Sequence, residues 1–162
     1  MRVRDVMTRD PVTIQAGEPV RKAAALLREH RVGGLPVVEG ERLVGMVTES
    51  DILRLLRTEE ISGDLWLPSP LEVIEVPIRE LVNWEKTRHA LAAVGEREVR
   101  EIMSHPAVTV REDDDIEEAA SLMVERRIGR LPVVRGDRLV GIVARSDIIR
   151  GIARPGPTEG DA

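Results

Sequence analysis

Two stretches of sequence decide the fold: VGGLPVVEGERLVGMVTESDILR at residues 32–54 and IGRLPVVRGDRLVGIVARSDIIR at residues 128–150. When the same offset of 96 residues is extended outward, residues 3–54 align with residues 99–150 without a gap, and 25 of the 52 aligned positions are identical. Chance similarity does not keep one register over so long a stretch. The chain therefore contains an internal repeat, and two halves of one fold are the expected architecture.

The first copy predicts five elements in a fixed order. A short β-branched run at 12–14 precedes a helix at 19–30, whose apolar residues recur at helical spacing. LPVV then predicts a buried strand, Gly40 a tight turn, and LVGMVT the second strand of a hairpin. Ser50 predicts the N-cap of a short closing helix. The second copy repeats this pattern 96 residues later, so each repeat has the order β-α-β-β-α and the fold class is α+β.

One unit of about 50 residues buries too little surface to be stable alone. We therefore expect the two copies to pack sheet against sheet around a shared core, with pseudo-twofold symmetry and two equivalent clefts. The predicted division of the chain is a first repeat at 1–56, an insert at 57–98, a second repeat at 99–152 and a disordered tail at 153–162.

The insert lies outside the repeat. Its sequence predicts a loop at 62–70 and an amphipathic helix from about residue 78 to 94, closed by Gly95. The apolar residues of this helix are expected to face protein: Ile78, Leu81, Val82, Leu91 and Val94.

The composition excludes several classes of function. A net charge of −5 disfavours nucleic-acid binding, and the absence of cysteine excludes disulfides, thiolate metal sites and a cysteine nucleophile. No apolar run approaches the roughly 18 residues of a membrane span, and no signal peptide is recognisable, so a cytoplasmic location is expected. The sequence contains no phosphate-binding glycine loop and no nucleophile motif, so it predicts no enzyme.

Three elements that recur in both copies carry a resemblance to a known family. They are the VxxhM[TS] segments at 3–8 and 99–104, the GGLPVV and GRLPVV strands, and the GMVTESD and GIVARSD segments. Together they resemble the cystathionine-β-synthase (CBS) domain, whose tandem pair is called a Bateman module. The resemblance covers two copies of 52 residues, or 104 of the 162.

The resemblance implies a regulatory function without a catalytic cofactor. Such modules bind adenosine compounds such as AMP, ADP, ATP, S-adenosylmethionine or dinucleotides, and Mg²⁺ can accompany the phosphates. They frequently form homodimers in which four repeats make a flat disc. A ligand that enters a cleft would then shift the packing of the repeats or of the dimer, and an effector protein could detect that change.

The resemblance also implies which residues hold the ligand. In the G-h-h-T-x-x-D segment the aspartate faces the ribose hydroxyls and the threonine faces ribose or phosphate. These positions are Asp51 with Thr48, and Asp147 with Ala144. An ionised carboxylate can accept hydrogen bonds from both hydroxyls of a ribose. The alternative is that an aspartate in the first helical turn serves only to cap the helix.

The adenine is usually held by the early strand and the LPVV strand of the other repeat, which assigns two sets of residues. In one cleft the set is Thr48, Ser50, Asp51, Val108, Thr109, Val110, Ile128, Gly129, Arg130 and Pro132. In the other cleft it is Val12, Thr13, Ile14, Val32, Gly33, Gly34, Pro36, Arg145, Ser146 and Asp147. Glycines permit close approach of the backbone to the base. The alternative for the valines and isoleucines is the core, and for the two prolines the shaping of the strand.

The two clefts are not expected to be equal. The Asp51 cleft has the hydroxyl of Thr48 and the guanidinium of Arg130, which suit a phosphate. The Asp147 cleft lacks the hydroxyl and has Gly34 in place of the cation, although Arg145 can substitute. We therefore expect the Asp51 cleft to bind nucleotide better. An ion pair of Arg130 with Glu125 or Glu101 is the alternative role of that arginine.

A second hypothesis comes from a different functional class. The chain would be a non-catalytic dimerisation or scaffold protein whose clefts no longer bind nucleotide. Ala144 and Gly34 favour this interpretation for one cleft, whereas Thr48 and Asp51 oppose it for the other. An enzyme would be a third interpretation only if purified protein turned over a nucleotide.

Overall fold

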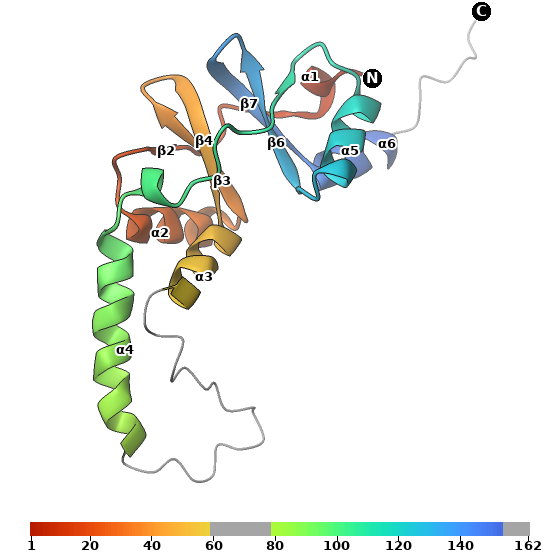
Figure 1. Cartoon of the computed structure of the whole chain (residues 1–162). Coiled ribbons are helices and arrows are strands. Elements are labelled where there is room, and N and C mark those ends of the chain that lie inside the picture. The colour runs from red at the N-terminus through yellow and green to blue at the C-terminus, as the bar shows by residue number, and fades with distance from the viewer. Residues whose placement is uncertain (59–78, 154–162) are drawn as a thin grey trace, which may run out of the picture.

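The computed structural model describes residues 1–58 and 79–153 (Figure 1). Each repeat forms one lobe, and helix α4 extends from the lobe of the first repeat. Along the chain the elements are α1 (Val3–Val6), β1 (Thr8–Arg9), β2 (Ile14–Gln15), α2 (Val20–His30), β3 (Gly34–Glu39), β4 (Arg42–Thr48), α3 (Glu49–Thr58), α4 (Arg79–Glu96), the 3-10 helix η2 (Val99–Glu101), β5 (Val110–Arg111), α5 (Ile116–Glu125), β6 (Arg130–Arg135), β7 (Arg138–Ala144) and α6 (Arg145–Ala153).

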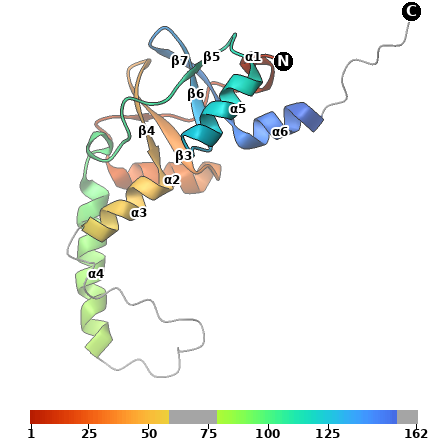
Figure 2. The ribbon, with the colours of Figure 1, turned by 45° about the vertical axis from the view of Figure 1, so that its right-hand side comes forward.

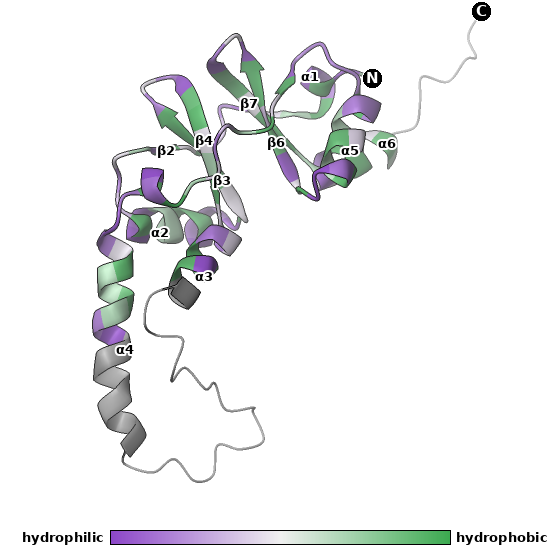
Figure 3. Ribbon diagram, viewed as in Figure 1, coloured by the Kyte–Doolittle hydropathy of each residue, from purple (hydrophilic) through white to green (hydrophobic). Residues whose placement is uncertain are grey.

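The predicted hairpins form in both repeats. Strand β3 pairs antiparallel with β4, and β6 pairs with β7 in the same register and with the bulge at the matching position. Gly40 and Gly136 begin the two turns with φ of +64° and +66°, a conformation that glycine adopts without a steric cost. The turns are hydrophilic and the strands behind them hydrophobic (Figure 3). This matches the predicted hairpin, whose strands are buried and whose turn is exposed.

The strand order shows the pseudo-twofold symmetry. The strands run β2-β3-β4-β7-β6-β5, so the order of the first repeat is mirrored by that of the second. The two halves join between β4 and β7 through a single pair, Arg42 opposite Arg138. The predicted α+β class and the order β-α-β-β-α are confirmed.

The first residues of each repeat pack on the opposite repeat. Val3 of α1 is fully buried in the core of the second repeat, and its N–H donates to the Asp114 carbonyl at 2.9 Å. Val99 of η2 is fully buried in the core of the first repeat, and its N–H donates to the Glu18 carbonyl at 2.9 Å. The expected single shared core is therefore two cores, each completed by residues of the other repeat.

The ends of three helices differ from the prediction. Helix α2 begins at Val20, and Pro19 is its N-cap. Helices α3 and α6 begin at Glu49 and Arg145, two residues earlier than expected, so Ser50 and Ser146 lie inside the first turn and are exposed. The predicted capping role of these two serines is wrong.

Helix α4 forms in the insert where the sequence predicts a helix, and it continues past Gly95 to Glu96. Its C-terminal end packs on α2: Val94 is buried, and Arg21 Nε lies 2.8 Å from Glu96 Oε1. The rest of the helix extends away from both lobes (Figure 2). Leu91 is 44% exposed, so the expectation that it faces protein is wrong within this chain.

Several predictions for the insert and the tail lie outside the described residues. They concern the loop at 62–70, the side chains of Ile78, Leu81 and Val82, and the tail beyond Ala153. Among residues 1–58 and 79–153 no helix is long and apolar enough to cross a membrane.

Candidate functional site

Two buried carboxylates mark equivalent places in the two repeats. Asp51 and Asp147 are 6% and 8% exposed, and they are the only buried charged residues in the described part of the chain. Each lies in the first turn of the helix that follows the hairpin, α3 or α6. A buried carboxylate is costly unless hydrogen bonds or a cation stabilise it, so its partners decide what it can do.

In the first repeat the partners of Asp51 form a reciprocal cap. Asp51 Oδ2 accepts hydrogen bonds from the Thr48 N–H at 2.8 Å and the Thr48 hydroxyl at 3.0 Å, and the Asp51 N–H donates to Thr48 Oγ1 at 3.3 Å. Asp51 Oδ1 lies 3.0 Å from Arg54 Nη2, whose side chain is largely exposed. Asp51 therefore caps α3 through Oδ2. Its other carboxylate oxygen, Oδ1, has a hydrogen bond within the described residues only to the largely exposed Arg54 side chain.

In the second repeat the same carboxylate has fewer partners. Asp147 Oδ2 accepts the Ala144 N–H at 2.8 Å, and Asp147 Oδ1 lies 3.4 Å from Arg150 Nη1. Because alanine stands where Thr48 stands in the first repeat, no hydroxyl contacts Asp147. One carboxylate oxygen of Asp147 is thus held only through a long contact to an exposed arginine.

Arg130 lies where the repeats meet. Its guanidinium, from the start of β6, packs against the first repeat so closely that a Cβ built on Gly34 would lie 2.8 Å from Nη1, and one built on Gly33 2.9 Å from Nη2. Nη1 is buried and has no hydrogen-bond partner among the described residues. Burial lowers the pKa of the Arg130 guanidinium from its usual value, and the nearby Glu49 carboxylate opposes that shift.

This position brings together residues that the sequence assigns to different clefts, and the expected difference between the clefts stays a prediction. The sequence assigns Arg130 to the Asp51 cleft and Gly33 and Gly34 to the Asp147 cleft, but the structure brings these three residues together. Arg130 makes no ion pair within the described residues. The alternative ion pair with Glu125 or Glu101 is therefore wrong, and Glu101 pairs with Arg97 instead.

The apolar residues assigned to the clefts fall into two groups. Four are almost completely buried: Ile14 and Val110 belong to the two cores, and Pro36 and Pro132 lie inside β3 and β6. The others are half-buried or exposed where the strands meet the surface: Val12, Thr13, Val32, Val108, Thr109, Ile128 and Gly129. The second group has accessible surface for a ligand, and its binding role stays a prediction.

One cavity, of about 180 Å³, lies away from the carboxylates. It joins the start of β4, at Leu43 and Val44, to the turn after β6, at Gly136 and Asp137, and to the segment before β5. Thr109 is the only residue of the predicted clefts that lines it. Neither aspartate borders this cavity, so it does not coincide with the site built around them.

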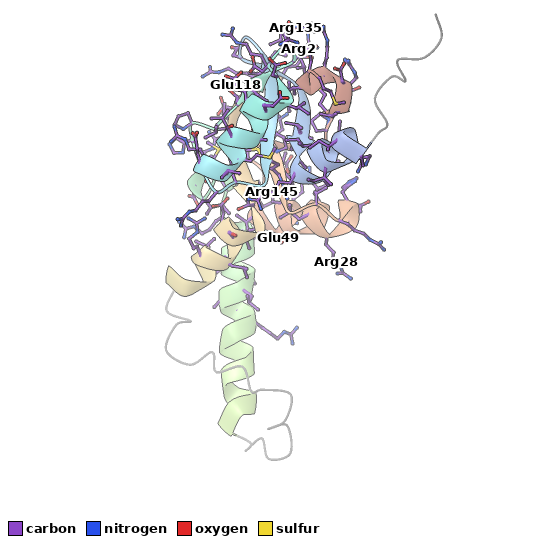
Figure 4. The ribbon with its side chains drawn as sticks, turned by 90° about the vertical axis from the view of Figure 1, so that its right-hand side faces the viewer. Arg2, Arg28, Glu49, Glu118, Arg135 and Arg145 are labelled. Atoms are coloured by element: carbon purple, nitrogen blue, oxygen red, sulfur yellow. The ribbon has the colours of Figure 1, made fainter. Side chains whose placement is uncertain are left out.

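Sequence reasoning missed three charged neighbours of the site: Arg54, Arg150 and Glu49. Arg54 and Arg150 follow the aspartates by three residues, a spacing that places side chains on one face of a helix and that the sequence displays. Glu49 and Arg145, which begin α3 and α6 (Figure 4), carry opposite charges at matching positions. No group of acidic residues and histidines that could hold a metal ion occurs in the described ranges.

The comparison with known families now decides the family. The model of the CBS domain matches residues 3–58 and 99–154. The chain belongs to the CBS-domain family. Its two matched ranges contain both hairpins and both buried aspartates, as the resemblance in the sequence predicts.

Known proteins resemble the chain over nearly its whole length. An uncharacterised protein of Methanocaldococcus jannaschii, MJ1426, is 33% identical over 154 residues, which cover 94% of this chain and 91% of that protein. Two crystal structures share its fold. CBSX2 from Arabidopsis thaliana, solved with AMP, is 26% identical with a TM-score of 0.67, over 93% of this chain and 95% of that one. The CBS pair of MJ0100, solved with 5′-methylthioadenosine and S-adenosyl-L-methionine, is 25% identical with a TM-score of 0.66, over 94% of this chain and 99% of that one.

Proposed function

We propose that this CBS pair is a non-catalytic regulatory module that binds adenosine-containing ligands between its repeats. The observation that carries the proposal is the matched pair of buried aspartates, Asp51 and Asp147, in the first turns of α3 and α6. The relatives solved with AMP, or with 5′-methylthioadenosine and S-adenosyl-L-methionine, support the ligand class. Occupancy would change the packing of the repeats and so be transmitted to a partner.

The chemistry of the site follows from the partners of each carboxylate. A ribose diol donates two hydrogen bonds, and an ionised carboxylate accepts both. The capping bonds of Asp51 use Oδ2, whereas the contact of Oδ1 is to Arg54, whose side chain is 69% exposed. Because the Arg54 side chain is exposed, it can turn into the solvent while ribose hydroxyls take its place as donors to the buried Oδ1. The Thr48 hydroxyl donates a hydrogen bond to the same carboxylate, so it is close enough to contact the sugar or a phosphate of a ligand bound there.

The first test is a thermal-shift screen of the full chain with adenosine, AMP, ADP, ATP, S-adenosylmethionine, NAD and cyclic dinucleotides. A ligand that binds the folded state at about one hundred times its Kd stabilises it by about 2.7 kcal/mol. Asp51→Ala and Asp147→Ala are expected to weaken binding in their own clefts by roughly 1.5–4 kcal/mol. Each shift is measured against the melting temperature of the same variant without ligand, because the aspartates also cap helices.

The matched control is Asp113→Ala, which removes an exposed carboxylate paired only with Arg4 in the structure. Its ligand-induced shifts should equal those of the unmodified protein. If no compound shifts the melting temperature, or if both aspartate variants keep every shift, the proposed function is wrong.

A scaffold protein is the second candidate, because both carboxylates already have partners within their own repeats and the cavity lies elsewhere. Homodimerisation is part of either proposal. Its support is the apolar surface on α5 and α6, where Val124, Ile149 and Ile152 are each more than 60% exposed. Mg²⁺ would enter only with a phosphate ligand, and the proposed location is the cytoplasm.

A further inference from the structure

Three large aliphatic side chains are exposed on the two helices of the second repeat, α5 and α6, which pack against each other. Val124 of α5 is 77% exposed, and Ile149 and Ile152 of α6 are each 66% exposed. The two isoleucines are three residues apart, so they lie on one side of α6. In the first repeat, Arg28 takes the position of Val124 and Leu53 that of Ile149. An apolar patch of this kind indicates a surface that a partner covers.

Charges of opposite sign mark the two ends of α5. The four exposed charges at these ends are Glu117 and Glu118 in the first turn, and Arg126 and Arg127 after the last residue. None of the four forms an ion pair with another described residue. The two arginines outnumber the one acidic residue at their end, Glu125. Glu117 and Val124 are two helical turns apart, so the acidic end and the apolar patch share one side of α5.

This order of charges is self-complementary when two α5 helices pack antiparallel. Across a twofold axis the acidic start of one helix lies beside the basic end of the other, and the same contact occurs twice. Helix α2 of the first repeat offers no acidic end, because its first turn has no acidic residue and its last turn contains Arg28. A second α5 can therefore neutralise both ends of α5, whereas α2 can neutralise only the acidic end.

The helices of the first repeat are already contacted by α4. Helix α4 packs on α2 and α3, where Val94 is buried and Arg21 pairs with Glu96. Figures 1 and 2 show α4 beside the first lobe, with α5 and α6 on the side of the second lobe away from it. A second copy that approached the helices of the first repeat would meet α4, whereas α5 and α6 can be approached without contact with it.

We infer that two copies of this chain associate head to head, with α5 and α6 of one copy packed on α5 and α6 of the other. The contact covers the three aliphatic side chains around a twofold axis. It also places the Glu117 end of each α5 beside the Arg126 end of the partner helix. The inference rests on the homodimer named in the proposed function, and it adds which repeat forms the contact and which charges orient it. No ligand is needed for this contact.

Sedimentation equilibrium of the full chain at several concentrations measures the Kd of the dimer. Ile149→Arg should raise that Kd by about a hundredfold or more, because it puts a charge into the apolar centre of the contact. The matched control is Leu53→Arg, which makes the same change at the equivalent exposed position of the first repeat. It should leave the Kd within about twofold. Both side chains are exposed in the single chain, and circular dichroism checks that both variants fold.

An exchange of charges tests the antiparallel pairing of the two α5 helices. The double variant Glu117→Arg, Glu118→Arg has two basic ends, and the double variant Arg126→Glu, Arg127→Glu has two acidic ends. Each should dimerise about tenfold to a hundredfold more weakly than the unmodified protein, because like charges then meet at both contacts. An equimolar mixture of the two should form heterodimers with a Kd close to that of the unmodified protein, because both contacts again join opposite charges.

Three results would overturn the inference. The unmodified protein could be monomeric at every concentration, which would leave the face to a different partner. Leu53→Arg could dissociate the dimer while Ile149→Arg does not, which would place the contact on the first repeat. The mixture of charge variants could remain as weakly associated as each variant alone, which would exclude the antiparallel α5 pair. The thermal-shift screen is a separate readout: if no adenosine compound binds but the dimer responds as stated, the proposed ligand function fails and this inference stands.

Discussion

The first and second repeats agree in their backbone but differ in charge and hydrogen bonding close to the two buried aspartates. Both hairpins have the same register, and both aspartates are buried at the start of a helix. The differences are Thr48 against Ala144, Glu49 against Arg145 and Gly34 against Arg130. The hairpins and the buried aspartates are shared, whereas these departures change hydrogen bonds and charge at one end of each hairpin. The departures are therefore where the functions of the two repeats can diverge.

The largest expected effect tests the shared part of the comparison. Leu35 and Leu131 occupy equivalent positions in β3 and β6 and are almost fully buried. Leu35→Ala and Leu131→Ala should each lower the free energy of unfolding by about 2–5 kcal/mol, because each leaves a cavity in a packed core. Urea denaturation measures both losses. A loss below about 1 kcal/mol in one variant alone would mean that the two cores are not equally packed.

A smaller effect should follow from the difference at Thr48. Thr48→Ala removes the hydroxyl that bonds the Asp51 carboxylate and N–H, and so gives the first repeat the cap of the second. The expected loss is about 0.5–2 kcal/mol, as for other N-cap threonines. Thermal unfolding measures it, since 1 kcal/mol shifts the melting temperature by about 2–4 °C in a chain of this size.

The reverse variant, Ala144→Thr, makes the second repeat like the first. It should raise the melting temperature if the new hydroxyl reaches Asp147 as Thr48 reaches Asp51. If Thr48→Ala leaves the melting temperature unchanged, the reciprocal cap contributes nothing to the stability of the first repeat.

The comparison also explains what the sequence could predict. The hairpins and their turns follow from local patterns: alternation of strand residues and a glycine at each turn. The two aspartates follow from the resemblance to the CBS domain. The exchange of Val3 and Val99 between the two cores does not, because it depends on contacts about 100 residues apart that no local pattern encodes. The location of Arg130 follows from the same long-range packing. The sequence shows that Arg130 and Gly34 are equivalent positions, but only the structure shows that the guanidinium of Arg130 fills the space that Gly34 leaves.

The smallest expected effect on stability tests the packing of the Arg130 guanidinium against Gly33. Gly33 and Gly129 are equivalent, but a Cβ on Gly33 would lie 2.9 Å from Arg130 Nη2, whereas one on Gly129 would meet only Arg145 Nε at 3.9 Å. Gly129→Ala should be neutral or stabilising by up to about 1 kcal/mol, since alanine restricts the unfolded chain. Gly33→Ala must displace the guanidinium and should be less stable than Gly129→Ala by about 1 kcal/mol. Adding Arg130→Met to each variant in a double-mutant cycle, measured by urea denaturation, should remove that difference. A difference that persists without Arg130 would show that contacts other than those of the guanidinium separate the two positions.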